Sequence, residues 1–395
     1  MIKKGLTLSL LFTCMMGHSQ ESIQSQHPHY GYIQLLYHTG VYWSRTQFLK
    51  EKFADGYKAV EVRIGFQTTG NKWWQQLNNY PGYGIGFHYA DLIADRKDVL
   101  VGNPLSAFVF YSAPRARIGR LSLHTDLSLG LSYASVIHDP VTNPLNDVIA
   151  SHVNLYFDFN VNVNYMLSDR LDLKAGYGVT HYSNGRIHEP QKGVNNWGWN
   201  MGLNYHFVQN KTNPANQKPV GSPNEKIPIR PEFIQSTAPG YTPFQELQFM
   251  YGAGVVDNQR LGDLVGTHYL TSSLTVDYAL AFHPRMAITF GVDALYDGSL
   301  VIGFMGVPPQ EVSILHKTHF GSHLGYQFFI DRVTLIANFG TYFFHYSNDR
   351  GYWFIRTGGR VRLTEHLHAH ICIKTKNGIS SDWIEWGLAC ALKIR

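Results

Sequence analysis

The stretch VNLYFDFNVNVNY at residues 153–165 decides the fold, because apolar and polar side chains alternate along its whole length. Its odd-numbered positions are apolar or aromatic, and its even-numbered positions carry four Asn, one Asp and one Tyr. A pleated strand sends successive side chains to opposite faces, so this segment has one apolar face and one polar face. The alternation predicts a β-strand, and the length of the segment suits a tilted strand that crosses a membrane.

The same alternation recurs along both halves of the chain and predicts about sixteen strands. Eight are expected in the first half, at residues 30–38, 58–68, 82–91, 104–112, 119–134, 151–167, 170–183 and 195–207. Eight more are expected at residues 244–254, 268–283, 286–297, 317–330, 332–346, 353–363, 366–376 and 383–394. Strands of soluble sandwiches usually have about five or six residues, and most of these runs are about twice as long. The expected fold class is all-β, an antiparallel transmembrane β-barrel, formed as two barrels of eight strands or as one larger barrel. A secreted soluble sandwich is the alternative.

The composition supports a membrane barrel and argues against several other classes. Of 395 residues, 15% are charged and 14% are aromatic, and the formal net charge is +5. A typical soluble domain has roughly 25% charged residues, so this chain is poor in charge. No segment after the N-terminus approaches the ~18 apolar residues that a membrane helix needs. Disorder, a helical membrane protein and a nucleic-acid partner are therefore not expected.

The chain is expected to divide into four regions. Two Lys precede a short apolar run, which predicts a signal peptide at residues 1–19 and export of the remaining chain. Residues 20–208 then form the first barrel, and residues 244–395 form a second barrel-like region. Between them, residues 209–243 carry seven of the 17 prolines, which predicts an extended linker. A chain that is exported and forms a transmembrane β-barrel is expected in the outer membrane, and the alternation of long loops with short turns agrees with such a barrel.

The cysteines and histidines do not point to a metal or a cofactor. Cys372 falls on the polar face of its strand and Cys390 on the apolar face of the next, so no disulfide joins them. His366, His368 and His370 share one face of a strand. Consecutive residues on one face lie about 6.5–7 Å apart, which is awkward for a single ion with bonds of ~2.0–2.1 Å. We expect no cofactor and no bound metal.

Polar side chains that could take part in catalysis lie together at one end of the hairpin formed by residues 170–183 and 195–207. The apolar face of the first strand continues into His181 and Ser183, and Asn195 begins the same face of the returning strand. Alternate residues lie about 6.5–7 Å apart, so the two side chains could lean together into a base–nucleophile hydrogen bond. The alternative interpretation is that these polar residues only mark the point where the strand leaves the membrane.

The segment His181-Tyr182-Ser183-Asn184-Gly185 is followed by Pro190, Gly193 and Asn195. This pattern resembles the signature of the lipid A 3-O-deacylases, outer-membrane enzymes that remove an ester-linked acyl chain from lipopolysaccharide. The resemblance covers roughly residues 30–207 and is strongest in residues 170–207. It implies an eight-stranded barrel whose site faces the membrane lipid, with lipid A of the outer leaflet as the substrate.

The resemblance also implies a role for each residue of the site. Ser183 would be the nucleophile and His181 its general base, while Asn184 and the backbone N–H of Gly185 would bind the oxyanion. The expected function is hydrolysis of the 3-position acyl ester of lipid A by a serine esterase. The alternative is a non-catalytic outer-membrane barrel that is structural, binds lipid or acts as a small porin.

The third member of the site departs from the family pattern. The family's acid, usually Glu, aligns with Asn195. An Asn can orient a histidine but carries no charge to stabilise the imidazolium. Glu189 in the same loop is a candidate substitute for that acid. The expected enzyme is a carboxylic ester hydrolase whose activity depends on this position.

A second copy of the tetrapeptide, His345-Tyr346-Ser347-Asn348, lies in the second half of the chain. It continues with Asp349, Arg350 and Gly351 and lacks the Pro-x-x-Gly-x-Asn pattern that completes the first copy. We interpret the second copy as coincidental. The second half resembles the extension found in some deacylase-like proteins, and the sequence attaches no chemistry to it.

Overall fold

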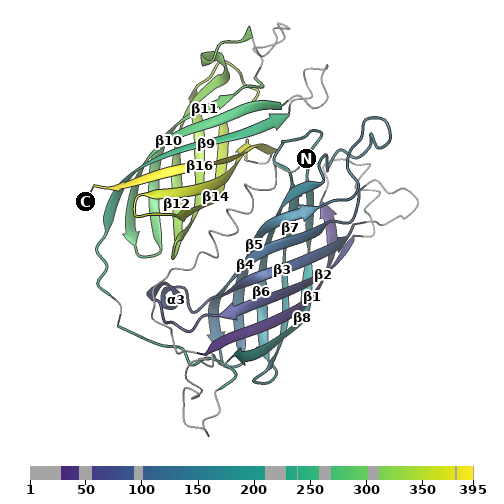
Figure 1. Cartoon of the computed structure of the whole chain (residues 1–395), viewed down its shortest axis with the longest axis vertical. Coiled ribbons are helices and arrows are strands. Elements are labelled where there is room, and N and C mark those ends of the chain that lie inside the picture. The colour runs from purple at the N-terminus through teal and green to yellow at the C-terminus, as the bar shows by residue number, and fades with distance from the viewer. Residues whose placement is uncertain are drawn as a thin grey trace, which may run out of the picture.

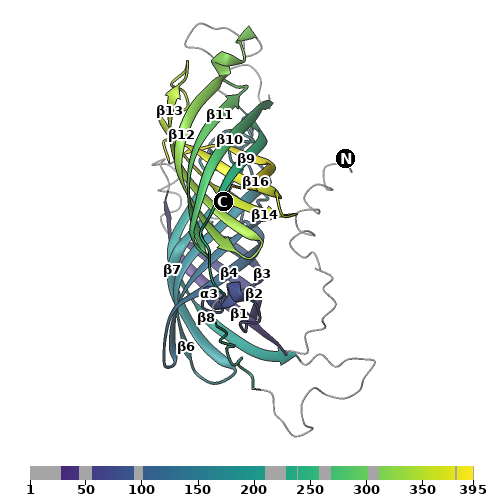
Figure 2. The same ribbon diagram turned by 90° about the vertical axis from the view of Figure 1, so that its left-hand side faces the viewer.

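Two closed barrels of eight antiparallel strands make up the part of the chain that the structure describes (Figure 1). This computed structural model describes residues 28–43, 56–92, 101–209, 228–237, 239–257, 268–300, 311–378 and 380–394. In each barrel the strands pair in sequence order, and the first strand closes the barrel by pairing with the eighth. Figure 2 shows the purple and teal first barrel below the green and yellow second barrel.

The first barrel contains the hairpin that carries the sequence motif. Its strands are β1 (His29–Trp43), β2 (Tyr57–Gln67), β3 (Gly82–Asp91), β4 (Leu105–Ile118), β5 (Leu121–Tyr133), β6 (Val153–Met166), β7 (Leu171–Ser183) and β8 (Val194–Gln209). The hairpin of β7 and β8 ends in the loop of residues 184–193, which we call the site loop. The site loop therefore lies at the end of the barrel away from the short turns that follow β4 and β6.

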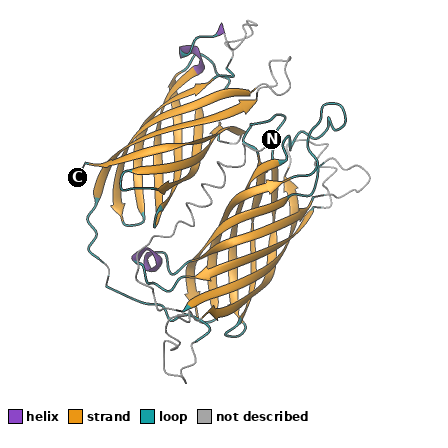
Figure 3. Cartoon of the chain, viewed as in Figure 1, coloured by secondary structure: helices purple, strands orange, loops and turns teal. Residues whose placement is uncertain are grey.

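The second barrel repeats the same architecture with longer and shorter connections in alternation. Its strands are β9 (Phe244–Asp257), β10 (His268–His283), β11 (Met286–Asp297), β12 (Thr318–Ile330), β13 (Val333–Phe344), β14 (Trp353–Arg362), β15 (Leu367–Lys376) and β16 (Ser380–Lys393). Helix is confined, among the described residues, to α3 (Trp73–Leu77) and the 3-10 turn η3 (Leu315–Lys317) (Figure 3). None of the described helices is long and apolar enough to span a membrane.

Polar side chains point into the barrels and apolar side chains cover the outside. In β6, Asn154, Asp158 and Asn160 are buried, whereas Val161 and Val163 are each 44% exposed. This arrangement inverts that of a soluble protein, in which apolar side chains are collected in the interior. A barrel surrounded by lipid needs it, because the hydrocarbon accepts apolar side chains and the closed sheet satisfies the backbone.

Ion pairs fill the barrel interiors. In the first barrel, Asp126 pairs with Arg63 (Oδ2 to Nη1, 2.9 Å) and with Lys174 (Oδ2 to Nζ, 2.5 Å), and all three are fully buried. Arg356 and Lys374 of the second barrel are buried and paired in the same way. Charges removed from water need such partners, so the pairs hold the strands together across the interior. Neither interior is an open channel at these levels.

The segment between the barrels packs against the turn end of the first barrel. Ile234 donates its backbone N–H to the carbonyl of Thr69 at 2.8 Å, and the ring of Phe233 stacks on that of Tyr80 with centroids 4.3 Å apart. Thr69 and Tyr80 belong to the connection between β2 and β3, which contains α3 and is longer than the turns that follow β4 and β6.

The predicted fold class is confirmed, and of the two arrangements left open the chain forms two barrels. The predicted bounds of β3, β10 and β11 agree with the structure residue by residue. By contrast, β4 continues to Ile118, six residues beyond its predicted end, because a bulge between Pro114 and Ala116 lets the strand pass a proline. Cys372 is buried and Cys390 half-buried, and both are free thiols. The expected signal peptide and residues 210–227 of the expected linker lie outside the described residues.

Candidate active site

The pairing of β7 with β8 places His181 directly opposite Asn195. His181 Nδ1 lies 2.7 Å from Asn195 Oδ1, which is hydrogen-bond distance. An amide oxygen can only accept, so Nδ1 carries the proton in this pair and donates it to Asn195. This tautomer leaves Nε2 of His181 unprotonated, and an unprotonated imidazole nitrogen is what a general base requires.

Ser183 ends β7 and begins the turn into the site loop. Its side chain is 5% exposed, and its Oγ accepts a hydrogen bond from the backbone N–H of Gly185 at 3.1 Å. Gly185 and Arg186 both have positive φ values, 65° and 71°. Two successive left-handed residues bend the chain sharply, so the Gly185 N–H points back at the serine oxygen.

His181 and Ser183 both lie close to Gly193. A Cβ added to Gly193 would stand 2.9 Å from His181 Cε1 and 3.5 Å from Ser183 Cβ. Gly193 also has a φ of 71°, a conformation that residues with side chains rarely adopt. A side chain at position 193 would therefore be strained and would crowd His181 and Ser183.

Asn184 shapes the site loop in this structure. Its Nδ2 donates to Ser151 Oγ at 2.9 Å and to the carbonyl of His188 at 3.1 Å. Its Oδ1 accepts the backbone N–H of Arg186 at 3.0 Å. The side-chain amide is thus engaged on both sides, and the donor directed at Ser183 Oγ is the Gly185 N–H.

Glu189 lies further along the site loop and faces a different partner. Its carboxylate oxygen is 4.0 Å from Arg186 Nε, and its backbone N–H donates to Asp257 Oδ2 at 3.4 Å. The hydrogen-bond acceptor that the structure gives His181 is Asn195. Asn195 is therefore the residue that holds the His181 ring in place, and Glu189 contributes to the contacts with the second barrel.

The site loop is also held by the loop between β5 and β6, which the sequence did not single out. Gly193 donates its N–H to the carbonyl of Val148 at 3.0 Å, and Ala150 donates its N–H to Gln191 Oε1 at 2.9 Å. Asn146 is fully buried and accepts the backbone N–H groups of Val148 and Ile149. Only the length of this loop was visible in the sequence, because its hydrogen bonds involve backbone groups with no local pattern.

Arg186 joins the site loop to the second barrel. Its guanidinium contacts Asp382 Oδ1 at 3.1 Å, Asp297 Oδ2 at 3.3 Å and Ser299 Oγ at 3.3 Å. All of these groups are buried. A Cβ on Gly185 would stand 2.3 Å from the side chain of Ile384, so the backbone of the turn also packs directly on the second barrel.

Arg350, two residues after the second copy of the tetrapeptide, takes part in the same joint. It follows this copy at the spacing at which Arg186 follows the first copy. Arg350 Nε lies 2.7 Å from Asp297 Oδ2 and 3.4 Å from Asp382 Oδ1, so the two arginines share two carboxylates. His345 Nδ1 instead lies 3.1 Å from the backbone carbonyl of Ser347, unlike His181 in the first copy. The arginine that follows the second copy thus has a structural role that the sequence did not indicate.

The histidines on β15 do not form one site. His368 and His370 are buried inside the second barrel, while His366 directs Nδ1 to the carbonyl of Ala391 at 3.1 Å. The side chain of His366 is therefore turned toward the backbone of β16 instead of toward the other two.

Comparisons with known proteins match both barrels. Residues 58–204 match the family model of the lipid A 3-O-deacylase (PagL), and residues 245–393 match that of the acyloxyacyl hydrolase, C-terminal domain. Among solved structures, the chain is similar to the outer membrane enzyme PagL at 14% identity and a TM-score of 0.28, covering 43% of this chain and 97% of that one. A triple-mutant porin of Rhodopseudomonas blastica shows 9% identity and a TM-score of 0.17, covering 92% and 99%. No curated protein matches. The two family models together span more than half of the sequence, and the chain belongs to the lipid A 3-O-deacylase and acyloxyacyl hydrolase-like family of outer-membrane proteins.

Proposed function

We propose that this chain is an outer-membrane serine esterase that hydrolyses the ester-linked acyl chain at the 3-position of lipid A. The observation that carries the proposal is the meeting of three groups at the end of the β7–β8 hairpin. His181 is oriented by Asn195, Ser183 and His181 both lie close to Gly193, and the Gly185 N–H is directed at the serine oxygen. The family match supports deacylation of lipid A as the reaction.

The proposed reaction begins with attack of Ser183 Oγ on the ester carbonyl. His181 Nε2 takes the serine proton as the bond forms, and the carbonyl oxygen becomes an oxyanion. A small shift of the acyl group toward the Gly185 N–H lets that donor stabilise the oxyanion. The imidazolium then gives its proton to the departing sugar oxygen, which leaves an acyl-enzyme. Water, deprotonated by His181, releases the fatty acid and restores the serine.

The proposed enzyme is slower with Asn195 than it would be with a carboxylate at this position. Its oxygen holds the imidazole in the tautomer that frees Nε2. It supplies no negative charge to the imidazolium that forms during each proton transfer, and that charge is what an acid contributes at this position.

The position of the site on the outer face of the barrel suits a lipid substrate. Trp197, Trp199 and Met201 extend the same face of β8, and Trp199 is 65% exposed. The ring of Tyr177 on β7 meets that of Trp199 edge-on with centroids 5.0 Å apart. An acyl chain lying along this apolar face would have its ester at the level of Ser183. Lipid A in the outer leaflet would then reach the site by lateral diffusion.

A pore is a poorer fit to the structure than an enzyme. The interiors of both barrels are crossed by fully buried ion pairs of Arg63, Lys174, Arg356 and Lys374 with carboxylates. A structural or lipid-binding barrel without catalysis is the remaining alternative, and it is separated from the esterase by a serine substitution.

The experiment is mass spectrometry of lipid A from cells that express the wild type, Ser183→Ala or Ser347→Ala. Ser347 is the matched control, because it occupies the same place in the second tetrapeptide and is also buried. We expect lipid A to lose one hydroxyacyl mass with the wild type and with Ser347→Ala, and to remain intact with Ser183→Ala. Intact lipid A with a wild type that is folded in the outer membrane would exclude the esterase.

A further inference from the structure

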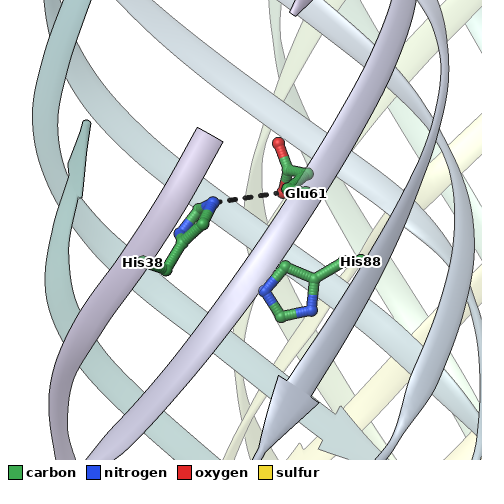
Figure 4. Close-up of side chains that lie close together, drawn as sticks. All are labelled: His38, Glu61 and His88. Atoms are coloured by element: carbon green, nitrogen blue, oxygen red, sulfur yellow. Dashed lines mark ion pairs between the residues drawn. The ribbon is translucent and has the colours of Figure 1, made fainter. Parts of the chain in front are cut away.

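Three metal-ligating side chains converge inside the first barrel, away from the site described above (Figure 4). His38 of β1, Glu61 of β2 and His88 of β3 all point into the barrel and are at most 2% exposed. One ligand atom from each lies within 4.8 Å of the other two. Glu61 and His88 are directly opposite in the β2–β3 pairing, so the register of neighbouring strands builds the cluster.

The atoms that face one another have no hydrogen-bond partners among the described residues. These atoms are His38 Nε2, Glu61 Oε2 and His88 Nε2, and all are buried. Buried polar atoms in folded proteins nearly always have a partner, because leaving one unpaired is costly. Three buried atoms on neighbouring strands that lack a hydrogen bond and are directed at the same place indicate a shared partner.

The spacing of these atoms suits a metal ion better than a direct hydrogen bond. His38 Nε2 and Glu61 Oε2 are 3.5 Å apart. A nitrogen–oxygen hydrogen bond is normally about 2.7–3.2 Å long. Two ligands of a tetrahedral zinc ion with bonds of ~2.0–2.1 Å are separated by about 3.4 Å. The observed separation therefore corresponds to one edge of a zinc coordination tetrahedron.

The groups behind two of the three side chains fix the orientation that metal binding requires. Tyr182 Oη lies 3.2 Å from His88 Nδ1, which leaves Nε2 of that ring directed at the cluster. Arg63 Nε donates to the other carboxylate oxygen of Glu61. Partners of this kind, on the far side of each ligand, are typical of metal sites in proteins.

We propose that His38, Glu61 and His88 bind a zinc ion that braces the first barrel from within. Two imidazoles and one carboxylate are a recognised zinc ligand set with room for one further ligand. The ion would tie β1, β2 and β3 together, and through His88 it would hold Tyr182, the residue between His181 and Ser183. Sequence analysis led us to expect no metal, because ligands on three different strands have no spacing motif.

The experiment measures zinc in the full chain folded in detergent, after dialysis against a chelator, reloading with ZnCl₂ and removal of excess. Inductively coupled plasma mass spectrometry should find about one zinc per chain in the wild type and in His124→Gln. His124 is the matched control because it lies in the same interior and hydrogen-bonds with Ser112 and Ser122. His38→Gln and His88→Gln should lose the zinc, and retention of an equal amount by both variants would overturn the proposal.

A second measurement keeps the test decisive if those variants fail to fold. Reloading the wild type with CoCl₂ should give the intense visible absorption of four-coordinate cobalt, and added ZnCl₂ should abolish it. A wild type that takes up neither zinc nor cobalt would overturn the proposal without any variant. Neither readout depends on esterase activity, so the zinc site and the proposed function can fail separately.

Discussion

Asn195 controls the proton on His181, and a single substitution tests that control. In Asn195→Asp, a carboxylate would replace the amide oxygen that lies 2.7 Å from His181 Nδ1. The carboxylate would stabilise the imidazolium formed during both proton transfers, so we expect the turnover number to rise by about tenfold or more. Turnover is measured on purified lipid A in detergent. Asn195→Leu, which cannot accept a hydrogen bond, should fall below the wild type, and equal rates for all three proteins would contradict this role.

Gly193 is required for a steric reason as well as a conformational one. In Gly193→Ala, the new Cβ would meet His181 Cε1 at 2.9 Å and force the ring or the loop to move. Misplacing a catalytic group by about 1 Å can cost roughly 10²-fold in rate, and we expect a loss of this order.

The control for Gly193 is Gly119→Ala. Gly119 has a φ of 58° and no atom within 4 Å of the added Cβ, so it shares the backbone strain without the contact. Gly119→Ala should retain the wild-type turnover. Similar losses in both variants would show that backbone strain alone explains the effect.

At the scale of the element, the site loop depends on a residue that touches neither the ester nor His181. Arg186 ties the loop to Asp297 and Asp382 of the second barrel. In Arg186→Gln the buried carboxylates would lose one of their two arginines, and the turn that contains Gly185 would lose its anchor. We expect turnover on lipid A to fall by about tenfold or more while the barrels stay folded.

Arg350→Gln is the matched control for this anchor. It removes the other arginine from the same carboxylates but leaves the site loop tied to the second barrel. We expect its turnover to stay within about twofold of the wild type, although the stability of the second barrel should fall in both variants. If Arg350→Gln reduced turnover as much as Arg186→Gln, the effect would belong to the second barrel and not to the loop.

At the scale of the whole molecule, the joint between the barrels should weaken in acid. The rings of His188 and His268 meet edge-on across the joint with centroids 4.9 Å apart. Burial lowers the pKa of the His188 imidazole from its usual value, and the neighbouring His268 lowers it further, while Asp257 acts in the opposite direction. A free histidine has a pKa of about 6.5, so the released loop takes up a proton more readily than the docked loop as the pH falls below this value.

The measurement is limited proteolysis of the site loop in detergent at pH 7.5 and at pH 5. Cleavage should be faster at pH 5 in the wild type, because protonation of His188 favours the released loop. His188→Gln cannot take up this proton, so its cleavage should depend less on pH. An equal pH dependence in both proteins would exclude His188 as the cause.

The filled interiors predict the electrical behaviour of the molecule. Fully buried Arg63 and Lys174 cross the first barrel, and Arg356 and Lys374 cross the second. We expect no stable conductance steps when the purified chain is added to a planar lipid bilayer. Discrete channel openings that persist in Ser183→Ala would support the porin alternative.

The fold could be predicted from the sequence because lipid outside and polar groups inside impose a period of two on every strand. The alternation of residues 153–165 was therefore enough to define β6. The sequence could not distinguish one barrel from two, because closure depends on the pairing of β1 with β8 and of β9 with β16. Those pairings join distant segments, and the alternation is the same in either arrangement.

The site was predictable where its residues are neighbours in sequence and hidden where they are not. His181, Ser183 and Asn195 belong to one hairpin and were identified together. The partners of Arg186 lie 111 and 196 positions away, and no local pattern announces them. The same holds for the zinc ligands proposed on β1, β2 and β3. Contacts between charged side chains that are distant in sequence can be recognised only in the structure of the closed barrels.

The joint at Arg186 has a consequence for the order of events during biogenesis. The first barrel precedes the second along the chain, yet the loop carrying the proposed nucleophile obtains its anchor from residues of β11 and β16. The first half alone would therefore lack the anchor of the loop that carries the proposed nucleophile. The proposed activity would appear only after β16 has closed the second barrel. A chain with only its first barrel inserted would therefore not act on the surrounding lipid.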